Sequence, residues 1–301
     1  VYREEFLTHG IVTAPQPEAV EVGSLILRDG GNAVDAAISS ALVQTVVDPM
    51  MCGIAGFGSL QLYMPEKNFH GFIDFHTTAP SSVKEDMWED QIAYEARDGF
   101  GFILKNRANE VGYESIMTPG TLKGFYEAIQ EFGTMPWADI IQPAIDFAEE
   151  GFTISPAIDE FWVRSGSHGK ISMNEKLRKN EMSRKIFLDE EGNPYPVGTR
   201  IKNIDMKQTL ELIKQGGADV LYSGEIAKKI NDDMKSNGGF LSGTDLKDYK
   251  TIRNEPLWGN YKDLKISTNQ PPGGGIMVIQ MLNILEHFDL KSMGHNSPEY
   301  I

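Results

Sequence analysis

Cysteine is almost absent from this sequence of 301 residues, which contains only Cys52. A single cysteine cannot form an intrachain disulfide, so nothing in the chain requires an oxidising compartment. Cys52 stands between Met51 and Gly53 in an apolar, glycine-rich turn. Because free cysteine usually behaves as a small buried hydrophobe, we expect a buried structural thiol there rather than a nucleophile.

Long apolar runs and positive charge are also scarce. No run approaches the roughly 18 consecutive apolar residues of a membrane-spanning helix. Lys and Arg number 28 against 43 Asp and Glu, which gives a net charge of −15. Nucleic acids and anionic membranes bind basic patches, so the composition argues against nucleic-acid and membrane partners and is typical of a soluble globular protein.

Motifs for metal binding are missing as well. The six histidines are scattered, and neither a Cys-x-x-Cys nor a His-Glu-x-x-His spacing occurs. We therefore expect no metal site and no cofactor.

The first residues carry no signal-peptide pattern. The charged segment Val1–Phe6 is followed closely by Gly10–Ala14, which we predict to be a short strand. This favours a cytoplasmic location. A chain whose leader had been removed would look the same, so a periplasmic or secreted protein is the alternative.

The most informative stretch reads GGNAVDAAISSALVQTVVDPMMCGIAGFGSLQLYM. Ala33–Val47 is apolar on almost every face, which predicts a buried helix. Asp48-Pro49 ends this helix, because the residue before proline is pushed out of the helical region. A glycine-rich elbow, Gly53–Gly58, then leads into Ser59–Met64, an apolar run of strand length. The stretch thus predicts a buried helix, a tight turn and a buried strand.

Apolar periodicity and turn residues predict the other elements, within one domain that covers residues 1–301. Helices are expected over residues 15–28, 122–132, 137–150, 205–215, 225–234 and 276–288, with a largely helical segment over 155–184. Strand pairs are expected as a hairpin of 59–64 with 69–75, and over 255–266. Residues 81–106 are charged and aromatic and are expected to cover the core as helix and loop.

Several motifs follow one another in a fixed order along the chain. GGNAVDAA, the apolar helix, the glycine elbow and the apolar strand precede PGTLKGF, EFGTMPW, QPAIDFAEEGF and QMLNIL. This ordered set resembles the gamma-glutamyltransferase (gamma-glutamyltranspeptidase) family of N-terminal-nucleophile hydrolases. The resemblance spans nearly the whole chain. It implies an α+β fold, a four-layer αββα sandwich, in which this chain forms most of the large subunit.

The resemblance also implies a mechanism. Family members cut their own precursor before a threonine, whose hydroxyl then attacks the substrate with its own α-amine as base. That threonine would lie in a C-terminal small subunit from the same precursor, so no catalytic residue is expected in this chain. The implied reaction is hydrolysis or transfer of gamma-glutamyl or related acyl groups from small-molecule amides. The implied assembly is a heterodimer, with a dimer of heterodimers as a further possibility.

The segment DFHTTAP at Asp74–Pro80 stands where the family has D-x-R-E-x-A-P, whose arginine binds the α-carboxylate of a glutamyl donor. In this alignment His76 takes the arginine position and Thr77 the glutamate position, so both are implied to bind substrate. Arginine offers a permanent planar fork to a carboxylate, whereas histidine offers one or two donors and a charge that varies near neutral pH. Considered without the alignment, His76 is a polar residue at a strand end with no ligand.

This departure from the family pattern keeps other functions open. Gamma-glutamyl compounds are the leading substrates. A cephalosporin-acylase-like or oxamate-type amidohydrolase of the same family is the alternative. A hypothesis from another class is a non-catalytic binding or structural homologue, because the residue that decides between the two lies outside this sequence.

Overall fold

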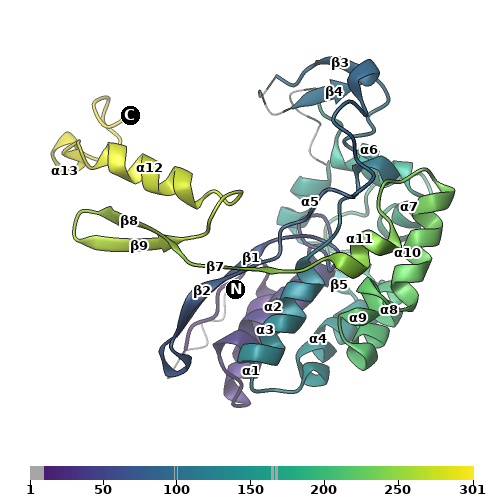
Figure 1. Ribbon diagram of the computed structural model, residues 1–301, viewed down its shortest axis with the longest axis horizontal. Helices are drawn as coiled ribbons and strands as arrows, with labels where there is room; N and C mark the ends of the chain where they lie inside the picture. The colour runs from purple at the N-terminus through teal and green to yellow at the C-terminus, as the bar shows by residue number, and fades with distance from the viewer. Residues whose placement is uncertain (1–9, 98, 100, 164–165, 167–168) are drawn as a thin grey trace. The chain divides into compact units, whose positions relative to one another are not determined.

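The computed structural model describes residues 10–97, 99, 101–163, 166 and 169–301. Figure 1 labels the helices and strands of this part of the chain. They form two compact units. The helical unit contains residues 10–57 and 77–250, and the sheet unit contains residues 58–76 and 251–301. Within the described residues, none of the helices has the length and apolar character needed to cross a bilayer.

The helical unit consists mainly of α-helices. They are α1 (Pro17–Arg28), α2 (Ala33–Val47), α3 (Thr121–Phe132), α4 (Trp137–Glu150), α5 (Pro156–Val163), α6 (Met173–Lys179), α7 (Glu181–Phe187), α8 (Ile204–Gly216), α9 (Asp219–Tyr222), α10 (Glu225–Ser236) and α11 (Gly243–Asp248). Short antiparallel pairs join β3 (Ile92–Glu95) to β4 (Phe102–Leu104) and β5 (Phe152–Thr153) to β6 (Arg200–Ile201). Short 3-10 turns lie at η2 (Glu89–Gln91) and η3 (Tyr113–Ser115).

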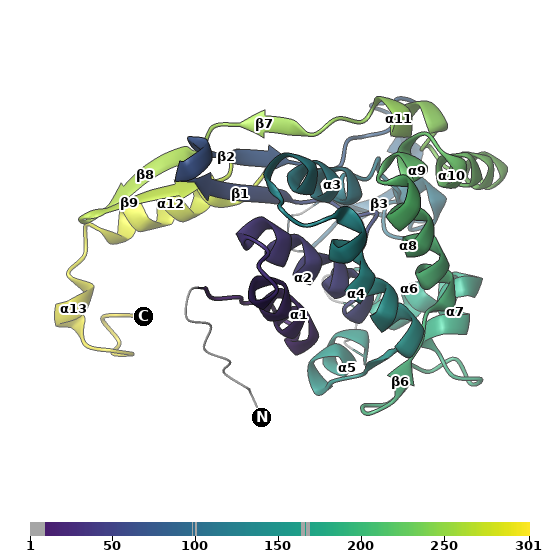
Figure 2. The same ribbon diagram turned by 90° about the horizontal axis from the view of Figure 1, so that it is seen from below.

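Helix α2 is the centre of the helical unit. Its large apolar side chains are buried, as expected for a helix that is apolar on almost every face. Its buried hydroxyls have backbone partners, because a buried polar group without one is costly. Ser39 Oγ donates to the Ile140 carbonyl of α4 at 2.9 Å, and Ser40 Oγ donates to the Ala19 carbonyl of α1 at 2.8 Å. Figure 2 shows α1, α2 and α4 side by side.

The first turn of α2 gives the physical reason for the GGNAVDAA motif. Gly30 has a φ of 92°, which favours glycine. Asn32 caps the helix by accepting hydrogen bonds from the Val34 and Asp35 amides, and the Asp35 carboxylate accepts one from the Asn32 amide at 2.8 Å. Asp35 is fully buried and also accepts from the Thr134 amide and hydroxyl. This carboxylate therefore joins the start of α2 to the turn between α3 and α4.

Two predictions for the helical unit are wrong. Ile11–Ala14 have no regular secondary structure, and Gly10 forms only an isolated bridge. A strand needs a neighbour for its backbone hydrogen bonds, and Ile11–Ala14 pair with no strand in the described part of the chain. The segment 81–106 contains the β3–β4 hairpin rather than a helix, because its aromatic and β-branched residues, such as Tyr94 and Ile103, pair across two strands. The helices predicted from periodicity are confirmed, and α2 has its predicted bounds.

The sheet unit begins with a three-stranded antiparallel sheet. Its strands are β1 (Ser59–Met64), β2 (Phe69–Asp74) and β7 (Ile252–Asn254), in the order β1-β2-β7. The predicted hairpin of β1 and β2 is confirmed, with the short 3-10 turn η1 (Pro65–Lys67) between the strands. Strand β2 is the central strand, and its last residue, Asp74, pairs with Ser59 on one side and Ile252 on the other.

Strand β1 is not the buried strand that its composition predicted. Leu62 and Met64 are buried, but Tyr63 between them is 67% exposed. Successive side chains of a strand point to opposite faces, so this alternation shows that one face of β1 is covered and the other is open in this chain.

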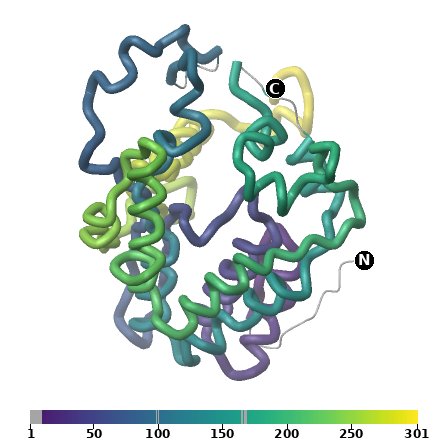
Figure 3. Tube along the Cα trace, turned by 90° about the vertical axis from the view of Figure 1, so that its right-hand side faces the viewer, coloured from purple at the N-terminus to yellow at the C-terminus, as the bar shows by residue number. Residues whose placement is uncertain are grey.

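The rest of the sheet unit is a second hairpin and two helices. They are β8 (Leu257–Tyr261), β9 (Leu264–Thr268), α12 (Gly275–Leu285) and α13 (Leu290–Met293), which confirm the predicted strand pair and helix. Helix α12 lies along the β8–β9 hairpin (Figure 2). A Cβ on Gly259 of β8 would lie 2.7 Å from Ile279 Cγ2, so glycine is required for this close approach. The order of the segments can be followed from purple to yellow along the tube in Figure 3.

Candidate functional site

The predicted substrate-binding residues lie just after the central strand of the sheet. Strand β2 ends at Asp74, and the boundary between the two compact units falls between His76 and Thr77. His76 therefore belongs to the sheet unit, and Thr77 belongs to the helical unit.

The His76 side chain is held by Asp74. Asp74 Oδ1 lies 2.9 Å from the backbone nitrogen of His76 and 2.7 Å from ring Nδ1. The second carboxylate oxygen, Oδ2, lies 3.5 Å from Nδ2 of Asn254 on β7. Both partners of the Asp74–His76 pair are largely shielded, since their side chains are 12% and 23% exposed. The sheet thus orients the imidazole through a single carboxylate.

This geometry limits what His76 can offer to a ligand. A carboxylate oxygen can only accept, so Nδ1 carries a proton and donates it to Asp74. The ring can then present at most one nitrogen, Nε2, to a substrate. Arginine at the same place would present a fork of parallel donors that matches a carboxylate. His76 is therefore suited to a single hydrogen bond rather than to bidentate recognition of a carboxylate.

Thr77 contacts a different part of the chain. Its hydroxyl donates to the Met117 sulfur at 3.6 Å. The next residue, Thr78, forms an antiparallel bridge with Thr118, with N–H···O distances of 3.3 and 2.9 Å. The Thr118 side chain is buried, and its hydroxyl has no hydrogen-bond partner within the part of the chain that the structure describes. This segment is thus fixed in the helical unit through the turn that precedes α3.

The glycine elbow is bound within each unit by backbone hydrogen bonds. In the helical unit the Gly56 carbonyl accepts from the Gly120 and Thr121 amides, at 2.9 and 3.2 Å. In the sheet unit Gly58 and Phe75 exchange two hydrogen bonds, at 3.3 and 3.0 Å. These contacts bind the elbow to the PGT turn in the helical unit and to the residue before His76 in the sheet unit.

Cys52 does not have the properties of a nucleophile. It is partly rather than fully buried, and its sulfur accepts a hydrogen bond from Gln44 Nε2 at 3.4 Å. Burial and the nearby Asp48 carboxylate raise the pKa of the Cys52 thiol above its usual value. A raised pKa leaves little of the reactive thiolate at neutral pH.

Two partners of the predicted site were not identified from the sequence. Asn254 is 180 positions from Asp74, and Met117 is 40 positions from Thr77. Neither residue could be recognised from the sequence around it, because each contact depends on pairing between distant segments.

Among the described residues, no group of three or more His, Cys, Asp or Glu side chains could hold a metal ion.

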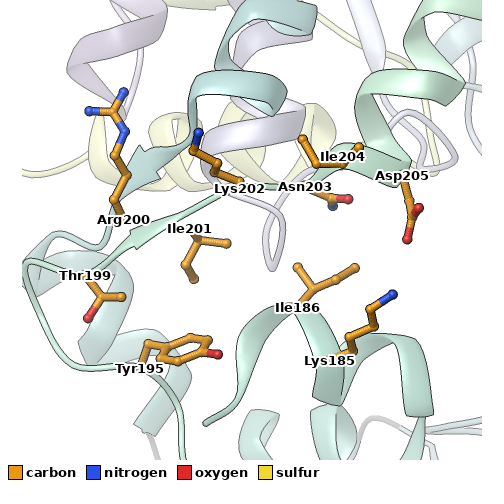
Figure 4. A pocket seen from close by; sticks show the side chains of 10 residues that line it. All are labelled: Lys185, Ile186, Tyr195, Thr199, Arg200, Ile201, Lys202, Asn203, Ile204 and Asp205. Carbon is orange, nitrogen blue, oxygen red and sulfur yellow. The ribbon is translucent and has the colours of Figure 1, made fainter.

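A cavity of about 460 Å³ lies elsewhere in the helical unit, between α7, β6 and the start of α8 (Figure 4). None of the predicted site residues lines it. Figure 4 shows Arg200 and Lys202 extending away from Tyr195 and Ile186, and Arg200 Nε donates to the Glu150 carbonyl at 2.8 Å. The cavity is therefore separate from the predicted site.

Comparison with known proteins assigns the chain to a family. The gamma-glutamyltranspeptidase family model matches residues 19–301. The Acylase ACY 1 proenzyme of Pseudomonas sp. (strain SE83) is 35% identical over 298 residues, which are 98% of this chain and 50% of that protein. The glutathione hydrolase proenzyme of Escherichia coli (strain K12) is 34% identical over 292 residues, which are 96% of this chain and 47% of that protein. This chain spans about half the length of these relatives.

Solved structures agree with the sequence matches. The crystal structure of Helicobacter pylori gamma-glutamyltranspeptidase superposes with a TM-score of 0.85 at 29% identity, over 98% of this chain and 80% of that chain. The predicted α+β fold class and the predicted family are therefore confirmed. The chain belongs to the gamma-glutamyltranspeptidase family.

Proposed function

We propose that this chain is the large-subunit part of a self-processing enzyme that hydrolyses or transfers gamma-glutamyl or related acyl groups. Family membership over residues 19–301 is the observation that carries the proposal. The matched curated relatives are named as proenzymes of glutathione hydrolases and of an acylase. The nucleophile would be a threonine in the part of the precursor that this chain does not contain.

The coverage of relatives supports a protein that matures as two chains. This chain matches 47–50% of the Escherichia coli and Pseudomonas proenzymes. It matches 80% and 82% of the crystallised chains of two gamma-glutamyltranspeptidases, from Helicobacter pylori and Pseudomonas nitroreducens. Crystallised chains that are shorter than the proenzymes are what a precursor cut into two subunits would give. We infer a C-terminal small subunit from the same precursor, with a dimer of heterodimers as a further possibility.

In this proposal the chain supplies one wall of the acyl pocket. His76 would donate or accept one hydrogen bond through Nε2, with its orientation set by Asp74. Thr77, the next residue along the chain, would add a hydroxyl group. The partner's threonine hydroxyl would attack the amide carbonyl and lose its proton to the threonine α-amine, and that proton would pass to the departing amine. Water or a second amine would then release the acyl group from the threonine.

A second candidate function is that of an acylase with another acyl group. The identity to the Acylase ACY 1 proenzyme, 35%, is as high as the 34% identity to a glutathione hydrolase proenzyme. His76 favours this candidate as well, because a single ring nitrogen is a weaker match than arginine for the α-carboxylate of a glutamyl group. A non-catalytic homologue is the remaining alternative.

Intact mass and N-terminal sequencing of the protein expressed from its full gene test the proposal. A second polypeptide that begins with threonine and copurifies with this chain is expected, and substrate screening would then begin with gamma-glutamyl and simple dicarboxyl amides. A single uncut polypeptide would contradict self-processing and favour the non-catalytic homologue.

The expected cytoplasmic location and the single domain also remain proposals. Cell fractionation would test the location. Limited proteolysis of the purified protein would test whether the helical unit and the sheet unit separate as independent domains or persist as one.

A further inference from the structure

Helix α12 carries large apolar side chains that are exposed in this chain. We name Met277, Val278, Met281, Ile284 and Leu285 the apolar stripe. Each of its members exposes between 39% and 59% of its surface. With 3.6 residues per turn, these positions fall within an arc of about 120° on the helix surface. Phe288, in the turn after α12, extends the stripe and is 50% exposed.

The other faces of α12 have different surroundings. Ile279 packs against Gly259 of β8. Just after the helix, Glu286 accepts a hydrogen bond from the Lys262 amide at 2.7 Å. Gln280 flanks the stripe next to Ile284, and Asn283 lies farther round the helix toward the Ile279 face. The stripe is therefore a separate face and not the one that holds the helix on the β8–β9 hairpin.

The sequence of α12 argues against a lipid surface as the occupant of the stripe. The helix reads GIMVIQMLNIL and contains no charged residue. Helices that lie on membranes carry Lys and Arg on their polar face. An 11-residue helix is also too short to span a bilayer, which needs roughly 17 to 25 residues. A helix that is apolar over most of its surface is typical of the interior of a larger protein.

We propose that the apolar stripe is the surface on which the other half of the precursor packs. The inference rests on the proposed function, in which this chain is one part of a longer proenzyme. The relatives are about twice as long as this chain, so a segment of about equal length is available to cover the stripe. Contiguous exposed apolar patches are rare on proteins that function alone. Two of the five members are methionines, whose flexible side chains adapt to a partner's shape.

Methionine oxidation measures this packing without any substitution. The protein expressed from its full gene is treated with hydrogen peroxide, and sulfoxide is quantified at each methionine by mass spectrometry. The oxidation rate of each methionine is divided by the oxidation rate of the same methionine in protein unfolded with guanidinium. Met277 and Met281 should react at least about 10-fold more slowly than in the unfolded protein. Met182 on α7, which is 47% exposed, is the internal control and should stay reactive. Oxidation of Met277 and Met281 as fast as Met182 would overturn the proposal.

Photo-crosslinking identifies the occupant. A photoreactive phenylalanine analogue replaces Met281 in one variant and Asn283, which faces away from the stripe on the same helix, in the control. An adduct between position 281 and a peptide of the C-terminal half is expected, with little or none from position 283. An adduct with a second copy of this chain, or with lipid, would overturn the proposal.

The two experiments separate this inference from the proposed function. If the precursor remains uncut, self-processing fails, while methionine protection and crosslinking still report whether the C-terminal half covers the stripe. If the precursor is cut and active but Met277 and Met281 react freely, only the docking inference fails.

Discussion

Asp74 holds His76 through one oxygen, which lies 2.9 Å from the backbone nitrogen and 2.7 Å from the ring Nδ1. The carboxylate therefore sets both the direction of the imidazole and the nitrogen that carries its proton. A substrate can meet only Nε2. We therefore expect substitution of either Asp74 or His76 to change how the enzyme uses its substrate.

Asp74→Ala should weaken substrate use by removing the group that orients His76. Loss of a hydrogen bond to a charged group is worth about 1.5–3 kcal/mol, so kcat/KM for a gamma-glutamyl anilide should fall by about 10-fold or more. The loss should appear mainly in KM, because Asp74 acts through a binding residue. Asp74→Asn keeps an acceptor oxygen and should recover part of the activity. Unchanged kinetics in Asp74→Ala would show that the pair does not contribute to the site.

His76→Arg should improve the use of a gamma-glutamyl anilide. Arginine would supply the bidentate contact to the α-carboxylate that a single ring nitrogen cannot make, and we expect kcat/KM to rise by about 10-fold. His70→Arg is the matched control, since it adds the same charge on β2, the strand that precedes His76, where His70 contacts the rings of Tyr63 and Trp258. If kcat/KM is the same in His76→Arg and wild type, His76 does not contact the acyl group.

Asp48→Asn should stabilise the protein at neutral pH. Asp48 is 8% exposed, and burial raises the pKa of its carboxyl above its usual value. Gln16 Nε2 donates to Asp48 Oδ2 at 2.5 Å, while Gln16 Oε1 is buried with no partner in the part of the chain that the structure describes. Asparagine removes the buried charge and offers an N–H to that oxygen. The gain in free energy of unfolding should be about 1 kcal/mol at pH 7.

The pH dependence of this gain has a definite sign. A carboxyl whose pKa is raised by folding stabilises the folded state fully below its unfolded pKa, near 3.8, and this contribution is lost as the pH rises through the folded pKa. The advantage of Asp48→Asn should therefore grow from pH 4 to pH 7, as measured by urea unfolding. In the background of Gln16→Ala, part of the gain should disappear. A variant less stable than wild type at both pH values would contradict the argument.

Gly58→Ala should destabilise the protein, because a Cβ at this position would lie 2.8 Å from Cε2 of Phe75. Overpacking of this kind costs about 1–3 kcal/mol. Gly53→Ala in the same elbow is the control, since its Cβ would meet no atom within 4 Å and should change stability by less than about 0.5 kcal/mol. Urea midpoints at unchanged m-values measure both effects. Equal stability of the two variants would refute the steric explanation.

The local sequence pattern was sufficient to predict elements whose apolar and turn residues determine their secondary structure. The apolar run Ala33–Val47 became α2 at its predicted bounds, because a helix apolar on all faces is stable only when buried. The β1–β2 hairpin followed from two apolar runs and the turn residues between them. The ordered motifs also identified the family. One of them, GGNAVDAA, contains the Asn32–Asp35 capping box, which is a local contact at the start of α2.

Local pattern failed where pairing between segments decides the structure. Strands β3 (Ile92–Glu95) and β4 (Phe102–Leu104) pair in place of the expected helix and loop, and Gly10–Ala14 formed no strand. The backbone hydrogen bonds of a strand come from another segment, so its own composition cannot determine whether it forms. The exposure of one face of β1 could not be predicted for a similar reason, because the burial of a strand depends on which segments cover its sheet.

The sequence alone determined the family, the helices and the position of His76 as a candidate for substrate contact. It could not show that Asp74 orients the ring, or that Asn254, 180 positions away, lies beside that carboxylate. The contact with Asn254 depends on β2 being the central strand between β1 and β7. Tertiary structure alone decided the position of Asn254, because hydrogen bonds between distant residues form only after strand register has placed their side chains together.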